Sequence, residues 1–301
     1  MPQSLRRLER EFSFAGELEP AWAAKPLALT RHEGRTILVL SDPGGEPLNR
    51  VLEREREQPL DLERLLRSAI NLAAALGHAH QHGLIHKEVK PENVLVDDSG
   101  HVWLTGFGLT SRLPRERQAP APPEVVAGTL AYMSPEQTGR MNRSIDTRSD
   151  LYSLGVTLYQ MLTGVLPFAA ADPLEWVHCH IARQPVAPAD RREVPEPLSA
   201  IIMRLLAKNA EDRYQTAAGV VADLQRCLVE WQTHGRIDSF PLGADDLSDR
   251  LLIREKLYGR EREVDTLLAA FDRVVAGARP ELVLVSGYSG VGKYSGFGPL
   301  R

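Results

Sequence analysis

Cysteine is scarce in this sequence of 301 residues, which contains only Cys179 and Cys227. Two cysteines are too few for a disulfide framework and are typical of a reducing compartment, so we expect a cytoplasmic protein. Neither sign of charge is in large excess, since 36 basic and 40 acidic residues give a net charge of −4. That balance argues against nucleic acid as a partner.

Long hydrophobic runs are also missing. No apolar run approaches the roughly 20 residues that span a bilayer, and the charged residues 1–11 lack the apolar stretch of a secretory signal. We therefore expect no membrane anchor. The remaining composition, 43% hydrophobic and 25% charged, is that of a globular chain with room for one large or two small domains.

The spacing of apolar residues predicts a mainly helical chain with few strands. A helix is expected to open the sequence, and a long helix is expected to run from an N-cap at Asp61 to about Gly83. Thr216 is the expected N-cap of a helix at 216–231. The other expected elements are helices at 150–162, 198–208 and 261–271, and strands at 26–30, 36–40, 93–96, 101–105 and 282–286.

A loop after the long helix carries several chemically active side chains in a row, since residues 86–93 are His-Lys-Glu-Val-Lys-Pro-Glu-Asn. Four further landmarks follow in this order: Gly106-Phe107-Gly108, Gly128-Thr129 with Ser134-Pro135-Glu136, Asp150 in an apolar helical segment, and Arg213. Together they resemble the H-R-D-x-K-x-x-N loop, the D-F-G motif, the end of the activation segment and the later helices of a eukaryotic-type serine/threonine protein kinase. Each match alone has a commoner explanation, such as an N-cap or a solvated charge, but their order favours the resemblance.

The resemblance implies an α+β, protein-kinase-like fold with a mainly helical C-lobe and a partial N-lobe sheet. It implies that Asp150 is buried and accepts hydrogen bonds from the backbone of the catalytic loop. It also implies a buried ion pair between Glu136 and Arg213 that ties the activation segment to the late helices. These roles are architectural and do not report on turnover.

The same resemblance assigns catalytic positions to Glu88, Lys90 and Asn93. Protein kinases pair a strand Lys with a helix Glu, and they hold two Mg²⁺ ions with the D-F-G Asp and the loop Asn. Glu11 is the best match for the helix Glu, Asn93 for the Mg²⁺ ligand, and Lys90 for the contact to the transferred phosphate. Glu88 stands in place of the catalytic Asp and extends the carboxylate by one methylene.

Several parts of the kinase machinery differ from the family pattern. Gly106 replaces the D-F-G Asp, which removes a carboxylate that would hold Mg²⁺. No Gly precedes Gly16, and Lys25 follows Glu11, so the sequence encodes neither the Gly-rich loop nor the strand Lys. We therefore expect a catalytically impaired, pseudokinase-like domain that uses ATP and Mg²⁺ only if activity or nucleotide binding remains.

Regulation by phosphorylation of the activation segment is also not expected. Lys87 replaces the loop Arg that usually binds a phosphate on this segment, and residues 112–126 contain no Ser or Thr. The missing phosphate-binding Arg and the missing hydroxyl residues both argue against control by phosphorylation of this segment.

A second phosphate-binding pattern lies near the C-terminus. Residues 287–293, Gly-Tyr-Ser-Gly-Val-Gly-Lys, match a Walker A loop after a predicted strand, in which Gly287, Gly292 and Lys293 would contact phosphates. Tyr294 stands where the loop needs Ser or Thr for Mg²⁺. With Tyr258-Gly259-Arg260-Glu261, the segment resembles the start of the AAA-type ATPase that follows the kinase in large bacterial multi-domain signalling proteins. A disordered Gly/Ser tail is favoured over a working nucleotide site.

The expected domains are a partial N-lobe at 1–48, the C-lobe at 49–232, a linker at 233–258 and a truncated start of a P-loop ATPase domain at 259–301. Three functions stay open: an impaired kinase, a non-enzymatic binding or scaffold module, and a degraded fragment of a larger kinase-ATPase. The partner is unknown, and the exposed cleft face of the C-lobe favours association. A metal site at His178-Cys179-His180 is disfavoured because adjacent helical side chains diverge.

Overall fold

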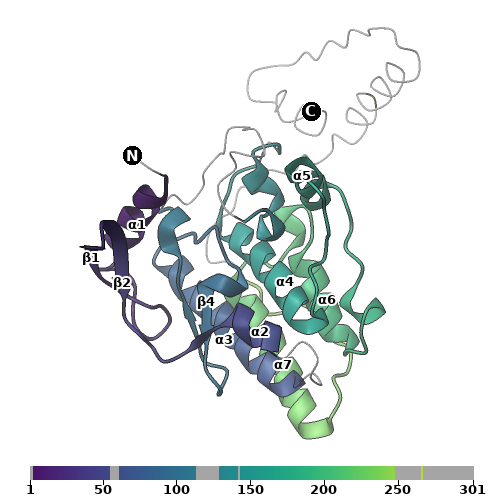
Figure 1. Ribbon diagram of the computed structural model, residues 1–301. Coiled ribbons are helices and arrows are strands. Elements are labelled where there is room, and N and C mark those ends of the chain that lie inside the picture. Colours follow the sequence, from purple (N-terminus) through teal and green to yellow (C-terminus); the bar gives the residue numbers. More distant parts are fainter. Residues whose placement is uncertain (1–2, 55–60, 113–128, 142, 248–265, 267–301) are drawn as a thin grey trace.

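The computed structural model describes residues 3–54, 61–112, 129–141, 143–247 and Thr266, and Figure 1 shows a small sheet with one helix beside a larger helical body. The helices are α1 Gln3–Ser13, α2 Leu48–Arg54, α3 Leu62–Gln81, α4 Thr147–Thr163, α5 Pro173–Ile181, α6 Glu196–Leu205 and α7 Ala217–His234. The strands are β1 Pro26–His32, β2 Arg35–Leu40, β3 Glu46–Pro47, β4 Val94–Val96 and β5 Val102–Leu104. The predicted α+β class is therefore observed.

The strands form two small antiparallel sheets. In the first, β1 pairs with β2 and places Leu29 opposite Leu38. In the second, β4 lies between β3 and β5, with Val94 opposite Leu104. The N-terminal part joins this second sheet because Leu104 donates its N–H to the Trp22 carbonyl oxygen at 2.9 Å. The N-terminal helix and hairpin are thus attached to the strand that leads into residues 105–109.

Helix caps follow local sequence where a polar side chain can reach the first turn. Asp61 accepts the Arg64 N–H at 3.0 Å and begins α3, as predicted. Thr216 caps α7 by accepting the Gly219 N–H at 3.0 Å, also as predicted. Helix α4 begins earlier than expected, because Asp146 accepts the Arg148 N–H at 2.9 Å. Asp150 consequently lies within the first turn of α4 and points its carboxylate elsewhere.

The helical body is built around α4, which runs through its centre (Figure 1) and is buried along almost its whole length. A Cβ added at Gly155 would lie only 2.7 Å from Leu205 Cβ on α6, so Gly155 permits the close approach of these two helices. A central buried helix gives a rigid base for side chains at its N-terminal end.

Several predicted segments lie outside the described residues, namely the helix at 261–271 apart from Thr266, the strand at 282–286, and residues 113–126 of the activation segment. Among the helices that the structure does describe, none has the length and apolar character of a membrane span.

Candidate functional site

The catalytic loop is anchored to α4 by Asp150. Its Oδ1 accepts the Lys87 N–H at 2.7 Å and its Oδ2 accepts the His86 N–H at 2.8 Å, while His80 Nε2 lies 2.9 Å from Oδ2. These contacts hold Lys87 at φ 67°, which is unusual for a non-glycine residue. Burial acts to raise the pKa of Asp150, but His80 and the loop groups outweigh it and leave the pKa below its ordinary value. The anchoring role implied by the sequence resemblance is therefore observed.

The three predicted catalytic residues lie together, and a fourth residue joins them. Lys90 Nζ lies 3.1 Å from Glu88 Oε1 and 2.6 Å from Thr129 Oγ1. The Thr129 hydroxyl also lies 3.3 Å from Glu88 Oε1. Asn93 donates from Nδ2 to the Glu88 carbonyl oxygen at 2.9 Å. We call Glu88, Lys90 and Thr129 the loop triad. Thr129 was seen in the sequence only as part of a landmark, because its reach to Lys90 depends on the fold.

Gly106 occupies the position that the resemblance assigns to the metal-binding Asp. It has a left-handed backbone, with φ 78°, which disfavours any residue that has a Cβ. A Cβ built there would lie 2.5 Å from Asn93 Cγ and 2.6 Å from Asn93 Oδ1. The Asn93 side chain therefore fills the space that a side chain at position 106 needs.

Glu11 reaches this position from α1. Its Oε1 accepts the Gly106 N–H at 3.0 Å, and only 7% of the residue is exposed. Burial raises the pKa of Glu11, and the backbone groups of Phe107 and Gly106 offset only part of that effect. Glu11, which the resemblance matches to the ion-pair Glu but for which the sequence offers no preceding Lys, thus accepts hydrogen bonds from backbone amides.

Phe107 fixes the backbone on the other side of Gly106. Its ring packs 4.7 Å from the His86 ring, centroid to centroid. His86 Nε2 in turn lies 2.8 Å from the Thr105 carbonyl oxygen. The loop of residues 86–93 and the turn at 105–109 are therefore positioned as one unit.

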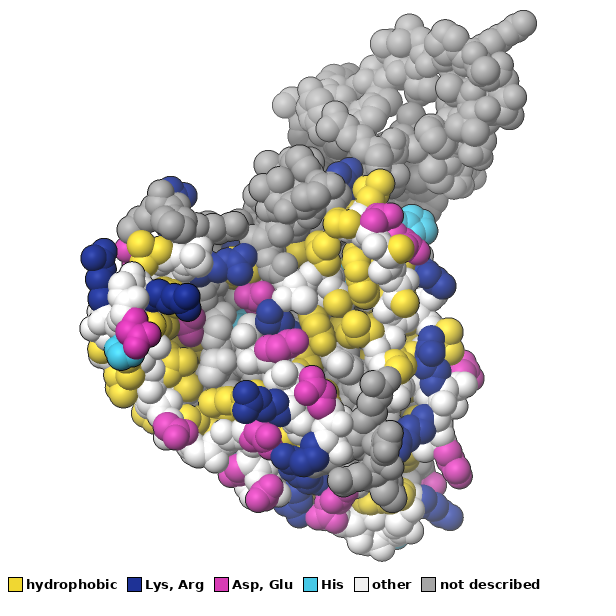
Figure 2. Space-filling model, viewed as in Figure 1, with side chains coloured by type: hydrophobic (Ala, Val, Ile, Leu, Met, Phe, Trp, Pro, Cys, Tyr) yellow, Lys and Arg dark blue, Asp and Glu magenta, His cyan; other side chains and the backbone are white. Residues whose placement is uncertain are grey.

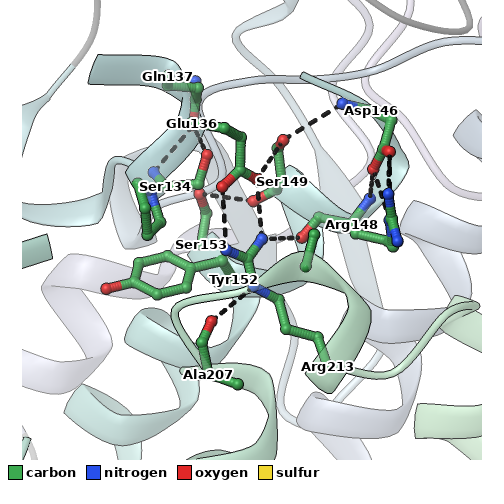
Figure 3. A network of polar contacts seen from close by, with 12 residues as sticks. Ser134, Glu136, Gln137, Asp146, Arg148, Ser149, Tyr152, Ser153, Ala207 and Arg213 are labelled. Atoms are coloured by element: carbon green, nitrogen blue, oxygen red, sulfur yellow. Dashed lines mark hydrogen bonds and ion pairs between the residues drawn. The ribbon is translucent and has the colours of Figure 1, made fainter. Parts of the chain in front are cut away.

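The predicted Glu136–Arg213 ion pair is present and buried (Figure 3). The two guanidinium nitrogens lie 2.8 Å and 2.9 Å from the two carboxylate oxygens. The Ser149 hydroxyl donates to Glu136 at 2.6 Å, and Arg213 also donates to the Ala207 carbonyl oxygen at 2.8 Å. Burial acts to raise the pKa of Glu136, but the adjacent Arg213 charge outweighs it, so the pKa lies below its ordinary value.

The donors near the loop triad do not match a two-magnesium site. Asn93 contributes one neutral amide oxygen, and Gly106 contributes no side chain. Within the described ranges, no group of three or more His, Cys, Asp or Glu side chains is arranged to hold a metal. His180 belongs to the His178-Cys179-His180 run, at which the sequence disfavours a metal site. It lies 3.0 Å from the Tyr152 hydroxyl and 2.8 Å from the Leu130 carbonyl oxygen. Gly287, Gly292 and Lys293 lie outside the described residues.

A groove of about 890 Å³ lies beside the catalytic loop and did not figure in the sequence predictions. Its walls come from α2, the start of α3, and residues 164–170 and 183–192. Figure 2 shows apolar side chains gathered on this side of the molecule near α5, and Val165, Leu174 and Val186 are all exposed large hydrophobics. This volume lies within the range of about 300–1,000 Å³ that is common for small-molecule sites.

Comparisons with known proteins find two families along the chain. The protein kinase domain family matches residues 5–223, and the AAA ATPase domain family matches residues 256–293. The first match covers every residue of the loop triad, together with Glu11, Gly106, Glu136, Asp150 and Arg213. The second covers the Walker A-like segment.

Three curated relatives illustrate the similarity. Hybrid signal transduction histidine kinase G of Dictyostelium discoideum is 39% identical over 188 residues, which is 56% of this chain and 5% of that protein. Serine/threonine-protein kinase PknB of Mycobacterium tuberculosis is 37% identical over 171 residues, covering 56% of this chain and 27% of PknB. Serine/threonine-protein kinase PksC of Streptomyces coelicolor is 34% identical over 198 residues, covering 65% of this chain and 35% of PksC. The chain therefore spans only about a third of these proteins, or less.

Proposed function

Because this chain belongs to the protein kinase family, we propose that it is a serine/threonine protein-kinase-type domain in which phosphoryl transfer is impaired. Two of the three relatives above are named serine/threonine-protein kinases, which supports the substrate class. The AAA ATPase match supports a place in a bacterial-type multi-domain signalling protein.

The observation that carries this proposal is Gly106. The kinase reaction relies on metal ions held by the D-F-G Asp and the loop Asn, which neutralise charge on the transferred phosphoryl group. Position 106 offers no carboxylate, and the neighbouring Asn93 fills the space where one would project. The ordinary two-ion arrangement therefore does not fit this site.

The residues that would orient the substrate hydroxyl are closer to the kinase pattern than the metal ligands are. Glu88 Oε1 is held by Lys90 and Thr129, so its carboxylate has a defined position from which it accepts a proton. The longer Glu side chain shifts that position relative to an Asp. A displacement of about 1 Å is enough to lower a rate by about a hundredfold.

A second function, recognition without catalysis, is favoured by a separate observation. The buried Asp150 and Glu136 contacts keep the helical body intact, and the groove of about 890 Å³ beside the loop remains open. A partner bound in this groove would depend on the helical body, but it would not depend on a metal ligand at position 106.

A radiolabelled phosphate-transfer assay tests the proposal. The purified chain is incubated with Mg²⁺, labelled ATP and a generic Ser/Thr protein substrate, and its rate is compared with that of PknB under the same conditions. We expect a rate at least about a hundredfold lower than that of PknB. Glu88→Gln should remove any remaining transfer, whereas Glu63→Gln, an exposed substitution on α3, should leave it unchanged.

A rate within tenfold of PknB that depends on Glu88 would refute impaired transfer. A thermal shift with Mg-ATP, and with ATP plus a chelator, separates the two candidate functions. Stabilisation without transfer supports a binding module, and equal stabilisation with and without Mg²⁺ supports the loss of the metal site at Gly106.

A further inference from the structure

The chain folds back along α7 after that helix ends. Gly235 terminates α7 with φ 65°, and residues 236–247 then contact successively earlier parts of the chain. The Asp238 N–H donates to Glu230 Oε2 at 2.9 Å, and the Gly243 N–H donates to Asp223 Oδ2 at 2.7 Å. Residues 236–247 therefore lie antiparallel to α7, from its end towards its start, and we call them the clasp.

Asp246 pins the far end of the clasp. Only 3% of its side chain is exposed. Its Oδ1 accepts the Thr216 N–H and the Thr216 hydroxyl, each at 2.9 Å, and its Oδ2 accepts the Gln215 N–H at 2.7 Å. Arg204 on α6 lies 3.8 Å from Oδ2 and supplies a positive charge. A carboxylate with three donors and a cation at a helix N-terminus is strongly held.

Apolar and aromatic contacts hold the middle of the clasp. Ile237 is buried, and Phe240 and Leu242 pack against the hydrophobic core. The Arg226 guanidinium lies 4.2 Å from the centroid of the Phe240 ring. Arg204 Nη1 also donates to the Leu242 carbonyl oxygen at 2.6 Å. The two terminal nitrogens of Arg204 therefore contact two different residues of the clasp, Leu242 and Asp246.

Two glycines make room for this arrangement. A Cβ at Gly219 on α7 would lie 2.6 Å from Asp246 Cβ, so any larger residue at position 219 would displace the Asp246 side chain. Gly243 has φ 71°, and a Cβ there would collide with Arg204. The helix face and the returning chain are therefore complementary in shape as well as in charge.

The clasp lies between the two family matches, since the kinase match ends at residue 223 and the AAA ATPase match begins at residue 256. Without these contacts the free chain would run from the end of α7 at Gly235 to residue 256 and could extend about 70 Å, whereas the stretch from 247 to 256 reaches only about 30 Å. Effective concentration falls roughly as the −3/2 power of linker length. Attachment at Asp246 therefore raises the effective concentration of the second segment about three- to fourfold.

We propose that the clasp holds the AAA-type segment of the same chain close to the kinase-type domain. Asp246 would fix the point at which the connecting chain leaves that domain. The surface formed by α6 and α7 is therefore covered by residues 236–247 of the same chain. This coupling involves a different face from the loop triad, and it does not depend on whether phosphoryl transfer is impaired.

Hydrogen–deuterium exchange of the 301-residue chain tests the attachment. In the unmodified chain we expect amide exchange across 236–247 to be slowed. Asp246→Ala should accelerate exchange across the whole clasp at least tenfold, while α3 and α4 stay unchanged. Asp245→Ala, which removes the same charge from the exposed neighbouring residue, should leave the clasp protected. Asp246→Asn provides a milder variant in case the Ala variant fails to fold.

The alternative is that Asp246 only caps α7. In that case Asp246→Ala and Asp246→Asn would accelerate the amides of Gln215 and Thr216 but leave 236–247 protected, and this result would overturn the proposal. Rapid exchange of 236–247 in the unmodified chain would overturn it as well.

A distance measurement tests the coupling itself. Spin labels are placed at Val229→Cys, an exposed position on α7, and at Lys256→Cys, where the AAA match begins, while the buried Cys179 and Cys227 remain unlabelled. We expect Asp246→Asn to lengthen and broaden the distance distribution, and Asp245→Asn to leave it unchanged. Identical distributions with and without Asp246→Asn would refute coupling even if the clasp were protected from exchange.

Discussion

Buried carboxylates in two regions of the molecule have opposite electrostatic character. In the helical body, Glu136 is paired with Arg213 and Asp150 with His80, and the pKa of each acid lies below its ordinary value despite burial. On the cleft side, burial raises the pKa of Glu11, which is bound by backbone amides. The comparison shows that the ionised forms of Glu136 and Asp150 are favoured by their partners despite burial, whereas the ionised form of Glu11 is not.

The largest effect is expected from removing a partner inside the helical body. Arg213→Met would leave Glu136 buried without its cation, and such a loss typically costs about 3–5 kcal/mol. Urea denaturation followed by circular dichroism measures the free energy of unfolding. Arg67→Met is the matched control, because Arg67 forms an exposed pair with Glu63 on α3 and its loss should cost below about 1 kcal/mol.

The double variant Glu136→Gln plus Arg213→Met sharpens this test. It removes the buried charge together with its partner, so much of the stability lost in Arg213→Met should return. If the double variant were as unstable as the single one, the compensation argument for the helical body would be wrong, and packing alone would explain the loss.

An intermediate effect is expected at Gly106. Gly106→Ala requires a left-handed backbone with a Cβ and forces that Cβ against Asn93, which together should cost about 1–3 kcal/mol. Gly16→Ala is the control, because a Cβ there meets no atom within 4 Å. The same denaturation measurement applies. Equal stability of the two Ala variants would show that Asn93 yields easily, and it would weaken the claim that position 106 has no room for a metal-binding side chain.

The sequence identified the local and architectural features of the fold better than the long-range ones. The N-caps Asp61 and Thr216 were predictable because a cap depends on residues three positions away. The anchoring role of Asp150 was predictable only through the family resemblance. The start of α4 was misplaced, because Asp150 and Asp146 are both plausible caps and only the buried contacts of Asp150 exclude it from that role.

Long-range contacts account for what the sequence did not indicate. Thr129 joins the loop triad across 39 residues, and Asp246 reaches Thr216 across 30, so neither contact leaves a periodic signal in the sequence. Residues 233–258 were expected to be a linker because they lack apolar periodicity. The structure shows that 236–247 are held by polar contacts and three apolar anchors, while the domain boundary itself remains a prediction.

The smallest effect, and the sharpest contrast with Arg213→Met, is expected from Glu11→Gln. The Gln side chain can still accept the Gly106 N–H, while the buried charge disappears, so stability at pH 7 should rise slightly, by less than about 1 kcal/mol. Because the folded-state pKa of Glu11 is raised above 4.5, its protonation stabilises the native chain fully below that pH and this contribution is lost as pH rises. The advantage of Glu11→Gln should therefore shrink as pH falls from 7 towards 4.5. Thermal unfolding of both chains across this range measures the difference. A loss of several kcal/mol at pH 7 would mean that the Glu11 charge is compensated after all, and the two regions would then not differ.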